Sequence, residues 1–331
     1  MNPVDVLSEL RNKLLFHTEL TREELSALTG LSGASITNYT RLLLDSGAIA
    51  KESFRVPGVK RPVERLRLLP GEERALAVSA SPEQVETLLL GCDGSILERS
   101  VFNVGVPAQS ALLRAIDDAV RAGAANRPVR AVSLCVDGMI APEPGMIFRF
   151  EGIPDWEPCE VAGLLEAWHG IPVQRVFPRI MAATRGFASA AARPDRTGYL
   201  QYSGGRLRIG SFDRYRIRLG KCGTPGNAIH RSCGVASGPC FCGRGDCLAA
   251  CLAAAGENIS AITPAFSALF TEEGIRTVGI DWPEYGGRLA LSLSAAGIDA
   301  HIATGTELIT GRGLRELTAE LIPISERITG K

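Results

Sequence analysis

The sequence has 331 residues, of which 45% are hydrophobic and 22% are charged, with 36 lysines and arginines against 36 aspartates and glutamates. This composition excludes disorder as the dominant state, and the length predicts two or three domains because a single core stops growing near about 250–300 residues. A net charge of zero, taken alone, argues against nucleic-acid binding, but a chain average can hide a local excess of one sign.

The first seventy residues predict a winged helix-turn-helix. A capping-box pattern at Thr21 and Glu24 starts a second helix, Gly30 ends it, and Ser32 caps a third. Two short helices joined by a glycine-containing turn are typical of DNA-binding domains. The predicted helices cover residues 4–15, 22–29 and 33–46, and the two predicted strands of the wing cover residues 48–50 and 63–69.

The third predicted helix has two different faces. Ile36, Tyr39 and Leu43 share one face at a spacing that packs against neighbouring helices. The opposite face carries side chains of the kinds that read base edges or bind phosphates, namely Ser35, Thr37, Asn38 and Arg41. A solvated helix face is the alternative, but the turn before this helix and the wing after it favour DNA contact.

The predicted wing carries a local excess of positive charge. Between Lys51 and Arg67 the sequence has six basic residues (Lys51, Arg55, Lys60, Arg61, Arg65, Arg67) against two acidic ones (Glu52, Glu64). We expect Lys60 and Arg61, followed by Pro62, to contact backbone phosphates or the minor groove. An ordinary solvated turn is the alternative for these cations.

Beyond a hinge at 70–74, strand-like and helix-like segments alternate, which indicates an α/β layer structure. The predicted strands cover 75–78, 85–90, 130–136 and the glycine-rich stretch 198–219. The predicted helices cover 108–122, 161–168, 181–192 and 246–255. No run approaches the roughly 18 apolar residues of a membrane span and the start lacks a signal-peptide pattern, so we expect a cytoplasmic protein without a membrane partner.

Nine cysteines in a reducing compartment suggest metal or thiol chemistry rather than disulfides. Cys240, Cys242 and Cys247 form a C-x-C-x4-C pattern, and with His230 they predict a closed, four-ligand structural zinc site. Gly243 and Gly245 would let the backbone turn tightly there. Buried free cysteines are the alternative. Three of the remaining cysteines, Cys92, Cys135 and Cys159, are predicted to be core residues. For Cys222, Cys233 and Cys251 three possibilities stay open: core residues, alternative metal ligands or redox-sensitive thiols.

With these features the chain resembles the ROK family of repressors, open reading frames and sugar kinases, in particular its transcriptional regulators. The resemblance covers nearly the whole length and rests on residues 25–32, Arg61-Pro62, 153–156, 170–173 and the cysteine and histidine pattern with Gly243 retained. It implies a winged helix followed by a two-lobed, actin-like (ribonuclease H-like) α/β body. We therefore expect a DNA-binding domain at 1–70, a first lobe at 71–187, and a second lobe with the zinc site at 188–331.

The sequence departs from the family's kinases where their chemistry lies. Residues 78–82 lack the glycines of a phosphate loop, the second glycine-rich loop is reduced to 203–206, and Arg179 stands where the resemblance places the catalytic aspartate. The family's sugar-binding positions fall on Gly152, Asn227 and Ala249, and only His230 is retained. The resemblance thus implies no enzyme activity, and Arg179 suits a small anionic, sugar-derived effector. A dimerisation scaffold without a ligand is the alternative.

The sequence therefore predicts a DNA-binding transcriptional regulator, a repressor of the ROK type. Its partner would be double-stranded operator DNA, bound as a homodimer or a dimer of dimers, because two recognition helices must lie about one DNA turn, ~34 Å, apart. Two alternatives stay open: an ATP-dependent carbohydrate kinase with an appended winged helix, and a zinc or thiol redox sensor based on Cys233 and Cys251.

Overall fold

The computed structural model describes residues 3–322 except 56–61, 126, 142, 194, 204–205, 219–229, 231, 233–237, 241–242, 256–257 and 304. The chain falls into two compact units, the first made of Met1–Asp137, Pro144–Val176 and Arg315–Lys331 and the second of Gly138–Glu143 and Phe177–Leu314. The domain limits expected at residues 70 and 187 stay predictions. None of the described helices is long and apolar enough to cross a bilayer.

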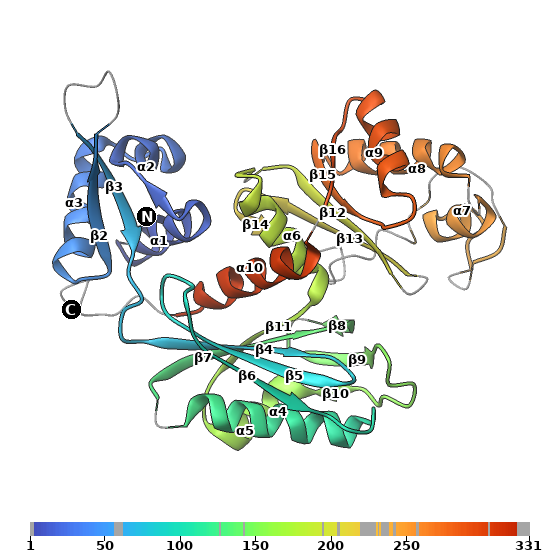
Figure 1. Ribbon diagram of the computed structural model, residues 1–331, viewed down its shortest axis with the longest axis horizontal. Helices are drawn as coiled ribbons and strands as arrows, with labels where there is room; N and C mark the ends of the chain where they lie inside the picture. The colour runs from blue at the N-terminus through green and yellow to red at the C-terminus, as the bar shows by residue number, and fades with distance from the viewer. Residues whose placement is uncertain are drawn as a thin grey trace. The chain divides into compact units, whose positions relative to one another are not determined.

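The first unit begins with the predicted winged helix-turn-helix, drawn in blue in Figure 1. Its helices are α1 (Pro3–His17), α2 (Arg22–Thr29) and α3 (Gly33–Asp45). Its three-stranded sheet has the order β1-β3-β2 and consists of β1 (Glu19–Leu20), β3 (Val63–Leu68) and β2 (Ile49–Phe54). The three predicted helices and both wing strands are confirmed, whereas β1, which pairs antiparallel with β3, was not predicted.

Local capping sets the limits of α2 and α3. The Thr21 hydroxyl accepts from the Glu24 backbone N–H at 3.1 Å, and the Glu24 carboxylate accepts from the Thr21 N–H at 2.7 Å, which is the predicted capping box. Gly30 has a φ of 71°, a left-handed conformation that ends α2 and favours glycine. The Ser32 hydroxyl accepts from the Ser35 N–H at 3.2 Å and caps α3.

The core of the winged helix contains a residue from the far end of the chain. Buried apolar side chains of its helices and sheet form one cluster with Ala319, the last residue of α10 (Thr306–Ala319). Arg11 of α1 donates to the backbone carbonyls of Glu320, at 2.6 Å, and of Ile322. Burial lowers the pKa of this guanidinium. The carbonyls that end a helix carry partial negative charge, so these contacts offset the desolvation of Arg11.

The rest of the first unit confirms the predicted α/β layers. A five-stranded sheet of order β11-β7-β4-β5-β6 combines parallel pairing of β4 with β7 and antiparallel pairing of β4 with β5. Helices α4 (Gln109–Ala124) and α5 (Val161–His169) lie side by side on one face of this sheet (Figure 1). The strands of the large sheet are β4 (Arg74–Ala80), β5 (Gln84–Leu90), β6 (Ile96–Asn103), β7 (Val129–Val136) and β11 (Val173–Pro178). Two short strands, β9 (Met146–Phe150) and β10 (Cys159–Glu160), pair antiparallel, and β8 (Gly138–Ala141) belongs to the residues of the second unit.

The second unit has its own five-stranded sheet, of order β14-β13-β12-β15-β16. The pairs β12–β15 and β15–β16 are parallel, and β13 is antiparallel to β12. Its strands are β12 (Thr197–Ser203), β13 (Arg206–Asp213), β14 (Arg216–Ile217), β15 (Thr277–Asp281) and β16 (Asp299–Ile302). Its helices are α6 (Arg179–Ala190), α7 (Leu248–Ala255), α8 (Ile259–Glu272), α9 (Gly286–Ala295) and the first part of α10.

Within the second unit α6 and α10 cross at two glycines. A Cβ on Gly313 would lie 1.8 Å from the carbonyl oxygen of Ala182 and 2.6 Å from the backbone nitrogen of Gly186, and a Cβ on Gly186 would lie 1.8 Å from the carbonyl oxygen of Ile309. No side chain fits between backbones that approach so closely. Glycine at both positions is therefore what allows the two helices to meet.

Candidate nucleic-acid interface and metal centre

Helix α3, the predicted recognition helix, presents its predicted polar face to solvent. Ile36 and Leu43 are buried in the domain core, whereas Thr37, Asn38 and Arg41 are exposed. Ser35 is half-buried and bonds through its hydroxyl with Ser32 at 3.0 Å, so this side chain belongs to the helix cap. Asn38 and Arg41 make no side-chain hydrogen bond or ion pair with another residue of the described chain. Their polar groups are therefore available to a partner.

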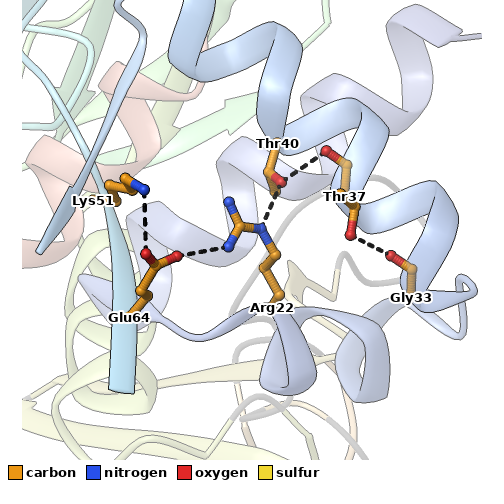
Figure 2. A network of polar contacts seen from close by, with 6 residues as sticks. All are labelled: Arg22, Gly33, Thr37, Thr40, Lys51 and Glu64. Atoms are coloured by element: carbon orange, nitrogen blue, oxygen red, sulfur yellow. Dashed lines mark hydrogen bonds and ion pairs between the residues drawn. The ribbon is translucent and has the colours of Figure 1, made fainter. Parts of the chain in front are cut away.

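A polar network, shown in Figure 2, connects α2, α3 and the wing. Arg22, the first residue of α2, donates through Nε to the hydroxyl of Thr40 at 3.1 Å and through Nη1 to the carboxylate of Glu64 at 2.9 Å. Nζ of Lys51 donates to the other carboxylate oxygen of Glu64 at 3.2 Å. The hydrogen bond from Arg22, followed by that from Lys51, lowers the pKa of Glu64. The sequence did not single out Arg22 or Thr40, although Arg22 follows the cap residue directly.

Ion pairs reduce the predicted charge excess of the wing. Three of its six cations are paired within the domain: Lys51 with Glu64, Arg65 with Glu19 at 3.3 Å, and Arg67 with Glu52 at 2.6 Å. The count along the sequence omitted Glu19 because it belongs to β1, more than forty positions before its partner. Arg55 is exposed, and Lys60 and Arg61 lie outside the described residues. Half of the six predicted cations of the wing are thus matched by carboxylates of the same domain.

Three of the four predicted metal ligands lie together in the second unit. Nδ1 of His230 is 3.6 Å from Sγ of Cys240 and 3.9 Å from Sγ of Cys247, and the three ligand atoms lie within 4.8 Å of one another. In a tetrahedral zinc site, nitrogen and sulfur ligand atoms are about 3.6 Å apart. The observed spacing therefore fits a shared metal ion. Cys242 lies outside the described residues.

Two local features prepare these ligands. The Gly243 N–H donates to the Cys240 carbonyl at 2.9 Å and closes a turn, which depends on the φ of 82° at Gly243. Gly245 does not have a left-handed conformation, so only one of the two glycines acts as predicted. Cys247 precedes α7, and its Sγ accepts from the Ala250 N–H at 3.4 Å, which fixes the side chain at the start of the helix. Burial lowers the pKa of His230, which favours the neutral imidazole that binds metals.

The other cysteines differ in burial and bonding. Cys92, Cys135 and Cys159 are free, and Cys135 is buried as predicted, whereas Cys92 and Cys159 are only half-buried, so their prediction as core residues is wrong. Cys251 is buried on α7 but is disulfide-bonded, which differs from the expectation that the cysteines stay reduced. Cys222 and Cys233 lie outside the described residues.

In the first unit, the segment at the position of a kinase phosphate loop forms a closed turn. Between β4 and β5 the chain makes a tight turn in which the Ser81 N–H donates to the Gln84 carbonyl at 2.9 Å and the Ser81 hydroxyl accepts from the Gln84 N–H at 3.2 Å. Gly152, a predicted ligand residue, lies against this turn. A Cβ on Gly152 would be 2.4 Å from Cγ of Pro82. Proline and glycine thus pack together where a nucleotide would need open backbone amides.

Arg179, the second predicted ligand residue, begins α6 in the second unit, where its guanidinium donates to the carboxylate of Glu307 on α10. Its positive charge is therefore already matched within the unit. Asn227, the third predicted ligand residue, lies outside the described residues.

Polar and aromatic side chains lie near the carboxyl ends of β12 and β15. Gln201 and Asp281 are register partners on these parallel strands, and the Gln201 side-chain amide donates to the Asp281 carboxylate at 2.9 Å. The rings of Tyr202 and Trp282 stack with centroids 4.5 Å apart, and Trp282 is buried in the apolar core of the second unit. The carboxyl ends of parallel strands are where α/β proteins usually bind ligands.

No family model and no curated protein sequence matches the chain. Among solved structures, a ROK family transcriptional regulator described as a homologue of the E. coli MLC protein resembles it with a TM-score of 0.65 and 16% identity, over 99% of both chains.

Kinases of the same family resemble a shorter part. The ROK hexokinase from Thermus thermophilus matches with a TM-score of 0.58 and 18% identity, over 73% of this chain and 97% of its own. A ROK family glucokinase from Streptomyces griseus, solved with glucose and AMPPNP, matches with a TM-score of 0.53 and 15% identity, over 74% and 99%. The chain thus has the fold of ROK proteins, an N-terminal winged helix followed by a sugar-kinase-like α/β body, which confirms the fold predicted from the sequence.

Proposed function

We propose that this protein is a DNA-binding transcriptional regulator of the ROK type. The observation that carries the proposal is the intact winged helix, in which α3 buries Ile36 and Leu43 and turns Asn38 and Arg41 to solvent. An Asn side chain can form two hydrogen bonds with adenine, and an Arg side chain can form two with guanine. The predicted cations of the wing would bind backbone phosphates. The fold likeness to a ROK regulator over 99% of both chains supports this proposal.

Regulation would work through a dimer that binds a two-fold operator and represses transcription. Two recognition helices about 34 Å apart match successive turns of one DNA face. A ligand that changes the geometry of the body would change this separation and so the affinity for the operator. The metal centre, proposed as a structural zinc site with Cys242 as fourth ligand, would fix the loop before α7.

Arg41 and Lys60 should contribute differently to DNA binding. We expect Arg41→Ala to weaken operator binding by about 10- to 100-fold and to relax the preference at one base pair, because a base contact is lost. Lys60→Ala should weaken binding about equally on all sequences and flatten the salt dependence, because a phosphate contact is lost. Fluorescence anisotropy on a selected operator and on a scrambled duplex, over a range of salt, measures both. Arg149→Ala, an exposed arginine on β9, is the control, and parent-like binding by all three variants would refute the assignment.

A carbohydrate kinase with an appended winged helix is the second candidate, since ROK kinases share the fold of the body. The local geometry opposes it. Pro82 packs on Gly152, and Arg179 offers no base to a sugar hydroxyl.

The effector of the regulator, in our proposal, is a small anionic derivative of a sugar. Its acidic group would replace the Glu307 carboxylate on Arg179, and Glu307 is free to yield because its side chain is 83% exposed. An exposed ion pair of this kind is worth only about 0–1 kcal/mol, so a ligand could displace it.

A thermal-shift series separates these readings. MgATP should leave the melting temperature unchanged, whereas glucose 6-phosphate or gluconate should raise it more than glucose does, since only ligands that bind the folded state stabilise it. A clear shift with MgATP would favour the kinase, and equal shifts with acidic and neutral sugars would contradict an anionic effector.

A further inference from the structure

Two cations, Arg22 at the start of α2 and Lys51 on the wing strand β2, lie close to the recognition helix α3 (Figure 2). Arg22 bonds to Thr40, the residue directly before Arg41 on α3, and reaches Glu64 on the wing strand β3. Lys51 projects from the neighbouring strand β2 to the same carboxylate. When α3 enters a major groove and the wing contacts the flanking backbone, one DNA strand must pass close to this place.

The side chain of Glu64 lies on the face of the wing that is turned toward α2 and α3. Glu64 pairs in register with Ser53, whereas the other acidic residue of the wing, Glu52, pairs with Arg65. Side chains alternate between the faces of a strand, so Glu52 and Glu64 lie on opposite faces of the same two-stranded wing. Only Glu64 lies toward α2 and α3, where it places a negative charge beside the proposed path of DNA.

The ion pairs of Glu64 contribute little to stability. The side chains of Lys51, Glu64 and Arg22 are 54%, 37% and 30% exposed, and ion pairs in contact with water add little to the free energy of unfolding. What the arrangement does provide is two cations converging on one anion, at 2.9 and 3.2 Å. A backbone phosphate accepts the same charge-assisted hydrogen bonds as a carboxylate.

We propose that Arg22 and Lys51 form a further phosphate-binding site for DNA, which Glu64 occupies in the free protein. This inference rests on the proposed function. On binding, a backbone phosphate takes over both cations and leaves Glu64 as an unfavourable neighbouring charge. Glu64 thereby lowers the affinity for every DNA sequence equally, because phosphates carry no sequence information. The site moderates binding so that the regulator can be released.

Glu64→Gln tests the proposal because it removes the charge and keeps the size of the side chain. We expect its affinity for the operator and for a scrambled duplex to rise by the same factor, about 3- to 10-fold near 0.15 M salt. The slope of log K against log salt should steepen by up to about one unit, because the site contacts the same phosphate with one more unit of net positive charge. Adding Lys51→Gln to this variant should reverse most of the gain. Anisotropy titrations over a range of salt measure each quantity.

The matched control is Glu52→Gln, which makes the same change of net charge on the opposite face of the wing. It should alter affinity by less than about twofold, since Arg67, the cation that it frees, lies on the face of the wing away from α2 and α3. Melting temperatures of both variants should stay close to that of the parent, which shows that folding is unchanged. Equal effects of the two substitutions, or weaker binding by Glu64→Gln, would overturn the phosphate site. A parent protein that binds neither duplex would instead refute the proposed function itself.

Discussion

Replacing Gly313 by alanine should destabilise the second unit by about 3 kcal/mol or more. The added Cβ would lie 1.8 Å from the carbonyl oxygen of Ala182 and 2.6 Å from the nitrogen of Gly186. Both are backbone atoms, so no side chain can turn away, and the helices α6 and α10 must separate. For a unit of this size the melting temperature should fall by roughly 6–12 °C, which scanning calorimetry measures.

Gly311 on the same helix provides the control. A Cβ there meets nothing within 4 Å. Since alanine favours helix over glycine by about 1 kcal/mol, Gly311→Ala should keep or raise the melting temperature. The comparison separates the close crossing from the general effect of filling a glycine. A melting temperature of Gly313→Ala equal to that of Gly311→Ala would show that the helices do not meet as described.

Cys247→Ser should abolish metal binding. Cys247 contributes one of three ligand atoms within 4.8 Å of one another, and a serine hydroxyl is a poor zinc ligand. We expect the zinc content to fall from about one ion per chain to less than about 0.1, measured by mass spectrometry of the metal. The melting temperature should fall by roughly 10 °C, because the binding energy of a structural zinc contributes to folding.

Cys159→Ser is the matched substitution, because Cys159 is a free cysteine on β10 in the first unit. It should retain one zinc ion per chain and resist chelators as the parent does. A parent protein without zinc, or full zinc content in Cys247→Ser, would contradict the proposed site.

Features encoded by neighbouring residues could be predicted from the sequence. Thr21 and Glu24 specify the start of α2 through contacts three residues apart, and Gly30 specifies its end. The same holds for the proximity of Cys240 and Cys247, since they belong to one short turn and to the residue before one helix. Such signals depend on local geometry and need no knowledge of the whole fold.

Contacts between distant segments could not be predicted in this way. Arg179 was predicted to bind an anionic ligand, yet its guanidinium is paired with the carboxylate of Glu307, 128 positions later in the chain. Pro82 and Gly152 likewise meet only because two loops of the first unit converge. Charge and small size at one position do not indicate which other segment will lie beside it, so these features needed the structure.

The contact between Arg11 and the end of α10 has a consequence for the synthesis of the protein. The carbonyls that Arg11 binds belong to residues 309 and 311 positions later in the chain. At about 5–20 residues per second, the ribosome delivers them roughly 15–60 s after α1. Until then Arg11 has no helix end to bind and the apolar cluster lacks Ala319. A nascent chain or prematurely ended product would therefore carry a winged helix without these contacts, and this domain would be less stable than in the finished protein.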